Sequence, residues 1–294
     1  MKNNYFLLIL AGLLSMAATA QMDPATVTIM TTEVTDDVYM LEGRGGNIMI
    51  VVSEDKTLMV DSQFAPLSDK IKQTIDSISS NDITYLVNTH HHGDHTGGNE
   101  NFNSEETTVV AQKNVLERLK SEDKATGYLP ELTLDEQIKL KMPNDPNIMV
   151  VHVHNAHTDG DSFVYFVDKN VVHMGDVFFK DKYPYIDLNS GGSINGYIAA
   201  QQLILKTINE DTHIIPGHGK LATVQDLKNS INMLKDLRDA ISLAMSRDQT
   251  KEEILANATI TKRYDELNYG DGFVNSERIK QTIYNSLKNP NTDK

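Results

Sequence analysis

The 294-residue chain contains no cysteine. This absence excludes disulfide bonds, a cysteine nucleophile, thiolate ligands to a metal ion and a lipidated cysteine behind an export signal. The stability of the chain must therefore come from packing, with help from any metal ion that it binds. A metal site would have to consist of histidine and carboxylate side chains.

Basic residues are few in comparison with acidic ones. The chain has 27 Lys and Arg against 41 Asp and Glu, which gives a formal charge of −14. Loss of Lys2 with an export signal would change this to 26 − 41 = −15. Such a surface repels phosphate backbones and anionic lipid headgroups. We therefore expect a small-molecule substrate, with no nucleic acid and no membrane as partner. Nothing in the sequence indicates the oligomeric state.

Long apolar runs are also absent, apart from one near the N-terminus. Positions 5–16 are nearly all apolar, follow Lys2 and precede Ala18-Thr19-Ala20. A basic start, a short apolar core and a small-x-small motif are typical of a secretory signal, and the run is too short to span a bilayer. We predict a signal peptide at 1–20 and one mature domain at 21–294, located in the periplasm or secreted. A membrane anchor or a buried helix is the competing interpretation.

The remaining sequence alternates β-rich runs with helical patterns. Apolar stripes at helical spacing predict helices over 67–78, 113–119, 224–241 and 279–287. Thr223 and Asp226 have the spacing of a capping box at the start of the third helix. A Tyr-, Asp- and Gly-containing loop at 180–195 is a candidate lid. The predicted strands are 27–30, 38–41, 47–52, 57–60, 83–87, 107–111, 148–153, 163–167 and 171–173. This order favours a layered α/β fold with helices outside two sheets.

All ten histidines lie between positions 90 and 218. The densest part is His90-His91-His92-Gly93-Asp94-His95, which follows a predicted strand and contains the pattern HxHxDH. Residues two apart in an extended segment project to the same side, so His90 and His92 can bind one ion while His91 points away. A bend at Gly93 would turn Asp94 and His95 toward a second ion. Imidazole and carboxylate ligands suit zinc, and also iron or manganese.

HxHxDH after a strand resembles the motif of the metallo-β-lactamase superfamily. The resemblance covers roughly residues 25–245 and includes Gly45-Gly46-Asn47 and Val60-Asp61. It implies a single-domain, four-layer αββα sandwich that binds two Zn²⁺ ions per chain. The implied ligands are His90, His92 and His157 for the first ion, Asp94, His95 and His218 for the second, and Asp176 as the bridge.

Several other residues have alternative roles. By the same resemblance, Asp61 supports the metal loop by hydrogen bonding a ligand histidine, although a turn-forming aspartate is an equal alternative. Lys180 could bind a substrate carboxylate, but a solvated surface lysine is the more common case. The same two alternatives, contact with a substrate or an ordinary surface position, apply to Tyr183 and Tyr185. The other five histidines are interpreted as structural or as supports for ligands: His91, His152, His154, His173 and His213.

The function expected from these residues is hydrolysis by a water molecule that two metal ions activate, with Asp94 orienting it. We favour a carboxylic derivative such as a lactam, lactone, ester or thioester. Histidine at position 92 disfavours a flavodiiron protein, and aspartate at position 176 excludes the β-lactamases that use cysteine there. A β-lactamase proper, a mononuclear iron dioxygenase of sulfur compounds and a noncatalytic metal-binding accessory protein of a periplasmic redox system remain open.

Overall fold

The structure is a computed structural model that describes residues 23–142 and 147–289. The predicted signal peptide at 1–20 lies outside these residues. Within them, no helix combines the length and the apolar character needed to cross a membrane.

The first sheet has seven strands in sequence order. Strands β1 to β4 pair antiparallel, whereas β4 to β7 pair in parallel. Because β4 and β5 are parallel, their C-terminal ends lie side by side at one edge of the sheet. The strands are β1 Met30–Thr35, β2 Val38–Glu42, β3 Ile48–Val52, β4 Thr57–Val60, β5 Ile83–Val87, β6 Thr108–Gln112 and β7 Leu132–Leu134.

The second sheet has five strands in the order β12-β11-β10-β9-β8. Strands β11 and β12 pair in parallel, and the other neighbours are antiparallel. The two parallel strands therefore end at the same edge. The strands are β8 Gln137–Lys141, β9 Asn147–His152, β10 Ser162–Phe166, β11 Val171–His173 and β12 His213–Ile215.

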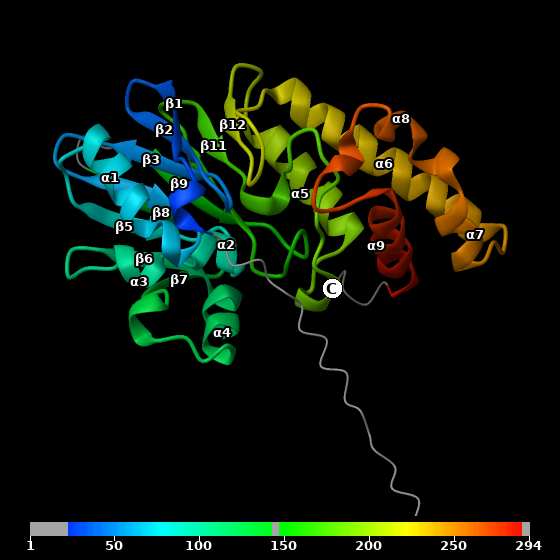
Figure 1. Cartoon of the computed structure of the whole chain (residues 1–294), viewed down its shortest axis with the longest axis horizontal. Coiled ribbons are helices and arrows are strands. Elements are labelled where there is room, and N and C mark those ends of the chain that lie inside the picture. The colour runs from blue at the N-terminus through cyan, green and yellow to red at the C-terminus, as the bar shows by residue number, and fades with distance from the viewer. Residues whose placement is uncertain (1–22, 143–146, 290–294) are drawn as a thin grey trace, which may run out of the picture.

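Helices cover the outer face of each sheet (Figure 1). A buried apolar cluster with members from both sheets fills the space between them. A second cluster packs α1 on the first sheet, and a third packs α5 and α6 on the other. The predicted αββα sandwich is thus confirmed. The helices are α1 Ser68–Ile78, α2 Gly93–Thr96, α3 Asn99–Phe102, α4 Lys113–Ser121, α5 Ile194–Thr207, α6 Val224–Ser246, α7 Lys251–Ala256, α8 Lys262–Asp265 and α9 Ser276–Lys288.

The first predicted strand was wrong. Residues 27–29 form no strand; β1 begins at Met30 and ends at Thr35. Val27 and Ile29 instead pack against the α1 side of the sheet, where Lys70 Nζ binds the carbonyl of Val27 at 2.6 Å. The apolar residues at 27–29 therefore belong to an irregular segment that packs on the sheet next to the edge strand β1. By contrast, the capping box of Thr223 and Asp226 at the start of α6 is confirmed.

Strand ends bring the chemistry-bearing residues to one place. Asp61 follows β4, and His90 comes three residues after β5. On the second sheet, Asp176 comes three residues after β11 and His218 three after β12, while His157 lies between β9 and β10. The edges of both sheets thus open onto a single site.

Candidate metal centre

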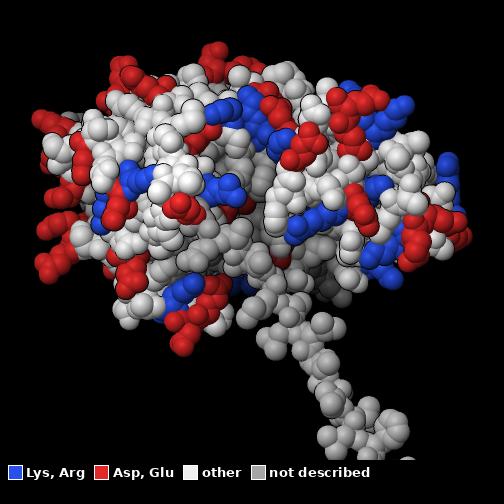
Figure 2. All heavy atoms as spheres, viewed as in Figure 1, with Lys and Arg blue, Asp and Glu red and all other residues white. Residues whose placement is uncertain are grey.

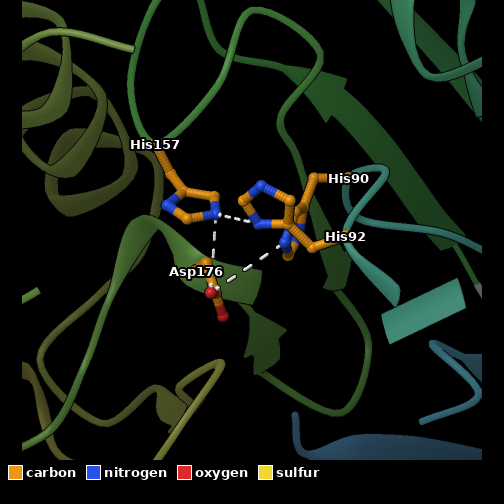
Figure 3. Close-up of side chains that lie close together, drawn as sticks. All are labelled: His90, His92, His157 and Asp176. Carbon is orange, nitrogen blue, oxygen red and sulfur yellow. Dashed lines mark hydrogen bonds and ion pairs between the residues drawn. The ribbon is translucent and has the colours of Figure 1, made fainter. Parts of the chain in front are cut away.

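The structure brings the seven predicted ligand residues together. His90, His92, His157 and Asp176 offer ligand atoms that lie within 4.8 Å of one another, as do Asp94, His95 and His218. Figure 3 shows the first group, with the imidazoles and the carboxylate pointing at a common space. These are the two groups that the sequence predicted.

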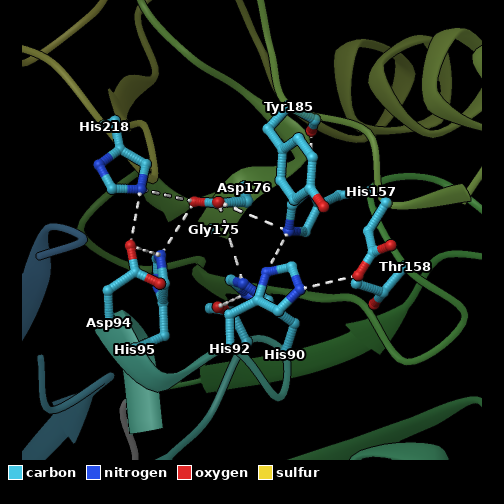
Figure 4. Close-up of polar contacts among 12 residues, drawn as sticks. His90, His92, Asp94, His95, His157, Thr158, Gly175, Asp176, Tyr185 and His218 are labelled. Atoms are coloured by element: carbon cyan, nitrogen blue, oxygen red, sulfur yellow. Dashed lines mark hydrogen bonds and ion pairs between the residues drawn. The ribbon is translucent and has the colours of Figure 1, made fainter. Parts of the chain in front are cut away.

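Asp176 lies between the two groups (Figure 4). Its Oδ2 atom is 3.5 Å from His157 Nε2 and 3.9 Å from His90 Nε2. Its Oδ1 atom is 3.0 Å from His95 Nε2 and 3.3 Å from His218 Nε2. One oxygen therefore faces each group. Asp94 completes the second group, with Oδ2 3.3 Å from His218 Nε2.

Hydrogen bonds at the outer ring nitrogens fix the tautomers of four histidines. His95 Nδ1 donates to Asp61 Oδ2 at 2.7 Å, and His157 Nδ1 donates to the carbonyl of Tyr185 at 2.7 Å. His92 Nε2 donates to Asp187 Oδ2 at 3.1 Å. In the neutral imidazole, which is the form that binds a metal ion, the other ring nitrogen then carries the lone pair.

The tautomer of His90 follows from a chain of bonds. Thr89 Oγ1 donates to Asp61 Oδ2 at 2.8 Å, so that hydroxyl can only accept from His90 Nδ1, which lies 3.0 Å away. His90 Nε2 is then a lone pair that points into the site. Asp61 is thus a support for the metal loop, as the resemblance implied, because it holds both Thr89 and His95.

The unpaired atoms fit a bound cation. His92 Nδ1 and His157 Nε2 are 2.8 Å apart. Because both carry lone pairs, this approach is repulsive unless a cation or a proton lies between them. His90 Nε2 is buried without a hydrogen-bond partner among the described residues, and the 3.0 Å contact of His95 Nε2 with Asp176 Oδ1 does not have the geometry of a hydrogen bond. Buried polar atoms are rarely left unpaired, so a metal ion is the partner that this donor set fits.

Asp187 is a support that the sequence analysis missed. Besides His92, it binds the backbone N–H groups of Asn189 at 3.1 Å and Ser190 at 3.2 Å through Oδ1. It therefore fixes the loop and the ring of His92 together. Nothing in the local sequence distinguishes it from other loop aspartates, because its partner lies 95 residues away.

Glycines let two loops close over the site. A Cβ atom on Gly46 would lie 2.0 Å from His95 Cε1, and one on Gly217 would lie 2.2 Å from Asp176 Oδ1. Asn47 locks these loops together, since its Nδ2 donates to the carbonyls of Pro216 at 2.9 Å and Gly219 at 2.8 Å. The Gly45-Gly46-Asn47 motif is thus part of the wall around the site.

The electrostatics of the site are dominated by burial and by the shared carboxylate. Burial lowers the pKa of His157 to about 4, and burial with the neighbouring imidazole of His95 lowers that of His90. For His218, burial is outweighed by Asp176 and Asp94, which raise its pKa to about 9. Burial would raise the pKa of Asp176, but the surrounding imidazoles lower it well below its usual range. Asp176 is therefore an ionised carboxylate between the two groups.

Most of the other histidines have contacts outside the ligand groups. His173 Nε2 donates to the Asn47 carbonyl at 2.9 Å, while its Nδ1 accepts from Gly175 N–H at 3.1 Å. His152 Nδ1 donates to the carbonyl of Asp161 at 2.7 Å, and His154 Nε2 lies 3.3 Å from Glu136. His91 is close enough to His92 and Asp187 to form a third potential ligand group. Its ring centre lies 4.5 Å from that of His92.

A cavity of about 780 Å³ opens beside the site. Lys180 is not part of it, because its Nζ binds the Leu221 carbonyl at 3.0 Å and Asp226 at 3.2 Å. The expectation of a solvated or substrate-binding lysine was therefore wrong, because Lys180 anchors the start of α6. The residues that line the cavity are Arg44, Phe64, His92, Gly93, Asp94, Asp176, Phe179, Lys182, Tyr183, Tyr185, His218, Gly272, Phe273 and Val274.

Fold and site together define a metal-dependent hydrolase. The sequence profile described as the metallo-beta-lactamase superfamily matches residues 41–218, which is more than half of the chain. The protein belongs to this superfamily.

Solved structures support the fold. The DIM-1 metallo-beta-lactamase is similar over 71% of this chain and 98% of its own, with 18% identity and a TM-score of 0.62. A metallo-beta-lactamase from Pontibacter korlensis is 15% identical over 71% of this chain and 100% of its own, with a TM-score of 0.63. TMB-1 is 18% identical over 70% of this chain and 97% of its own, with a TM-score of 0.60. Identities this low establish the shared fold only.

Proposed function

We propose that the protein is a dinuclear zinc hydrolase of carboxylic derivatives, such as lactams, lactones, esters or thioesters. The observation that carries the proposal is the position of Asp176, whose two oxygens face two separate ligand groups. A carboxylate shared in this way fixes the spacing of two cations. Iron and manganese also accept histidine and carboxylate ligands, but this set of ligands is less typical of them than of zinc.

His90, His92 and His157 would hold one ion, and Asp94, His95 and His218 the other, with Asp176 common to both. Two such ions supply polarisation of a substrate oxygen and acidification of a water molecule. The chain itself supplies rigidity, because Asp61, Asp187 and the Tyr185 carbonyl hold the imidazoles before substrate arrives. Preorganised ligands cost no rearrangement during the reaction.

Asp94 is the proposed catalytic residue. Its side chain is 28% exposed and lines the cavity, while Oδ2 faces His218. The carboxylate can accept a hydrogen bond from a water molecule in the cavity and direct its lone pair toward a bound substrate. Asp94 is the most exposed carboxylate in the described part of the site, because Asp176 and Asp61 are buried among imidazoles and Asp187 is bonded to His92.

A β-lactamase proper is the second candidate. The solved neighbours are described as β-lactamases, and their folds cover about 70% of the chain. Turnover of a β-lactam would place the protein with them, whereas turnover of a lactone, ester or thioester with no β-lactam activity would favour the broader proposal.

The test is a substrate panel with a matched variant. The purified protein, loaded with zinc, is assayed on a chromogenic β-lactam, an acyl-homoserine lactone, a nitrophenyl ester, an acyl thioester and a phosphodiester. The proposal predicts hydrolysis of at least one carboxylic substrate, lost on chelation and reduced by about 10²- to 10³-fold in Asp94→Asn. Zinc binding without any turnover would favour the accessory protein, and one iron with oxygen uptake would favour the dioxygenase.

We also propose that the protein acts outside the cytoplasm. The support is the apolar run at 5–16 with the Ala18-Thr19-Ala20 motif. Mass spectrometry of the mature protein from its native host should give an N-terminus at Gln21. An intact Met1 on a cytoplasmic protein would refute export.

A further inference from the structure

The cavity beside the metal centre has one wall that comes from the C-terminal helical region. Gly272, Phe273 and Val274 line it together with the metal-site residues Asp94 and His218. This wall lies outside residues 41–218, the part that matches the superfamily. Any specificity that the wall confers is therefore a property of this chain and not of the shared fold.

The wall is held in place by the buried loop that follows Asp176. Tyr183 is only 1% exposed, and its hydroxyl donates to Asp265 Oδ1 at 2.8 Å. The Tyr183 N–H donates to the carbonyl of Tyr269 at 3.1 Å, and Lys182 Nζ donates to the carbonyl of Asn268 at 3.1 Å. These bonds join the loop to the segment just before Phe273. The cavity wall is thus preformed.

Phe273 is exposed in a way that packing does not explain. It is 73% exposed, more than any other large apolar side chain in the described ranges. The guanidinium of Arg278 lies 4.3 Å from the centre of its ring, and the Tyr185 ring lies 5.6 Å away at an angle of 83°. These contacts orient the ring and leave much of it free. An oriented, solvated aromatic ring beside a catalytic site is a surface for an apolar ligand.

Two cations line the same cavity. Neither Arg44 nor Lys182 forms an ion pair with any residue that the structure describes, whereas nearby Lys180 is paired with Asp226. The net charge of the chain is −14, yet neither cation has a carboxylate partner among the described residues; Lys182 donates only to the carbonyl of Asn268. Figure 2 shows acidic side chains crowding one edge of the molecule and basic side chains near the central hollow. These two cations offset the carboxylates of Asp94 and Asp176, which also line the cavity, so an anion there does not meet the net negative charge of the surface as a whole.

We propose that residues 272–274 form a substrate-binding wall that selects a flat aromatic group, on a substrate that also carries a carboxylate. The ring of the substrate would pack on Phe273 and Tyr185, and its carboxylate would lie near Arg44 and Lys182. The inference rests on the proposed function for the reaction at the neighbouring metal centre. It concerns binding alone, so it can be tested separately.

The absence of tryptophan from the chain provides a direct probe. Phe273→Trp introduces a single indole in the wall, and Leu267→Trp introduces one at a position that is 60% exposed and outside the cavity. Each zinc-loaded variant is titrated with phenylacetate and with acetate while indole fluorescence is recorded. Acetate controls for binding of the carboxylate to the metal.

The proposal predicts a saturable fluorescence change in Phe273→Trp with phenylacetate, at least about three- to ten-fold tighter than with acetate. Leu267→Trp should show no saturable change. Replacing Arg44 by Gln in the Phe273→Trp protein should weaken phenylacetate about two- to five-fold. Equal responses to the two carboxylates, or equal responses of the two tryptophan variants, would overturn the proposal.

Kinetics give a second readout once a substrate is known. Phe273→Ala should raise KM for a phenylacetyl substrate about three- to ten-fold and leave kcat unchanged, with no effect on the acetyl analogue. Phe273→Tyr should retain the wild-type KM. An equal rise for both substrates would contradict an aromatic subsite. If no substrate is hydrolysed but the fluorescence change occurs, the proposed function fails while this inference stands.

Discussion

The two ligand groups of the metal centre differ in how they are built. His90 and His157 are 1% and 0% exposed and His92 is 22% exposed, and each imidazole of the first group donates its outer N–H to a fixed acceptor. In the second group, His95 is fully buried on Asp61, but Asp94 and His218 are 28% and 30% exposed. The ring of His218 is placed mainly by stacking on Phe179, with ring centres 4.9 Å apart and planes at 22°.

Under the proposed function, this difference gives the groups different roles. The first group would mainly bind a metal ion, and the second would also contact the substrate. Two of the three histidines of the first group are fully buried, and hydrogen bonds hold all three rings before any ligand binds. Asp94 and His218 of the second group line the cavity with Phe179, Tyr185 and Phe273, whereas His92 is the one histidine of the first group that lines it. We therefore expect the first group to bind its ion more tightly and the second to respond more strongly to changes near the cavity.

The largest effect is expected when the negative charge of Asp176, which faces both groups, is removed. Asp176→Asn keeps the shape of the side chain but loses the charge that faces both groups. We expect hydrolysis to fall on the order of 10³-fold or more, and the metal content to fall below that of the wild type. Asp168→Asn, on the surface, is the matched control and should change neither. Activity within tenfold of wild type in Asp176→Asn would contradict a shared carboxylate.

Truncating one histidine from each group should separate the groups. His218→Ala should lose the second ion while remaining about as stable as the wild type, because the side chain is partly exposed. His157→Ala removes a fully buried ring and should lower the free energy of unfolding by about 2 kcal/mol or more. Urea unfolding and elemental analysis measure both effects. Equal stability losses in the two variants would remove the distinction between a buried and an open group.

Asp187 tests whether ring support matters for the first group. In Asp187→Asn, the remaining Oδ1 can still accept from Asn189 and Ser190, but the amide nitrogen cannot accept from His92 Nε2. We expect zinc affinity to fall about 10- to 100-fold with little change in unfolding. Competition with a chromogenic chelator gives the affinity. An unchanged zinc affinity would show that the bond to His92 is dispensable.

The smallest expected effect lies outside both groups. Burial lowers the pKa of His152 below its ordinary value of about 6.5, with the Asp161 carbonyl only partly opposing it. Below pH 6.5 the unfolded chain therefore takes up a proton that the folded chain does not, and stability falls as pH falls. His152→Gln should remove this contribution, which is at most about 1.4 kcal/mol per pH unit. Urea midpoints at pH 7.5 and pH 5.5 measure it; an unchanged difference between them would refute the assignment.

The sequence predicts which residues cluster at the site better than it predicts their surroundings. HxHxDH places its chemistry in one short loop, and His157, Asp176 and His218 each stand out in short glycine-containing segments. The fold could be predicted because strands and helices alternate with clear apolar periods. The position of β1 could not, because Val27 and Ile29 are apolar for packing on the α1 side and not for pairing in the sheet.

The supports and the cavity wall depend on contacts across long stretches of chain. Asp187 binds His92, and Phe273 stands beside Tyr185, but neither residue has a local pattern that marks it. The same holds for the lysines, since Lys180 binds Asp226 while Lys182 lines the cavity. Such roles follow only from tertiary structure.

Zinc content per chain tests the central claim most directly. Elemental analysis of the purified, zinc-saturated protein and of His218→Ala should give two ions for the wild type and one for the variant, which retains the buried group. A single ion in both proteins would contradict two ligand groups that share Asp176.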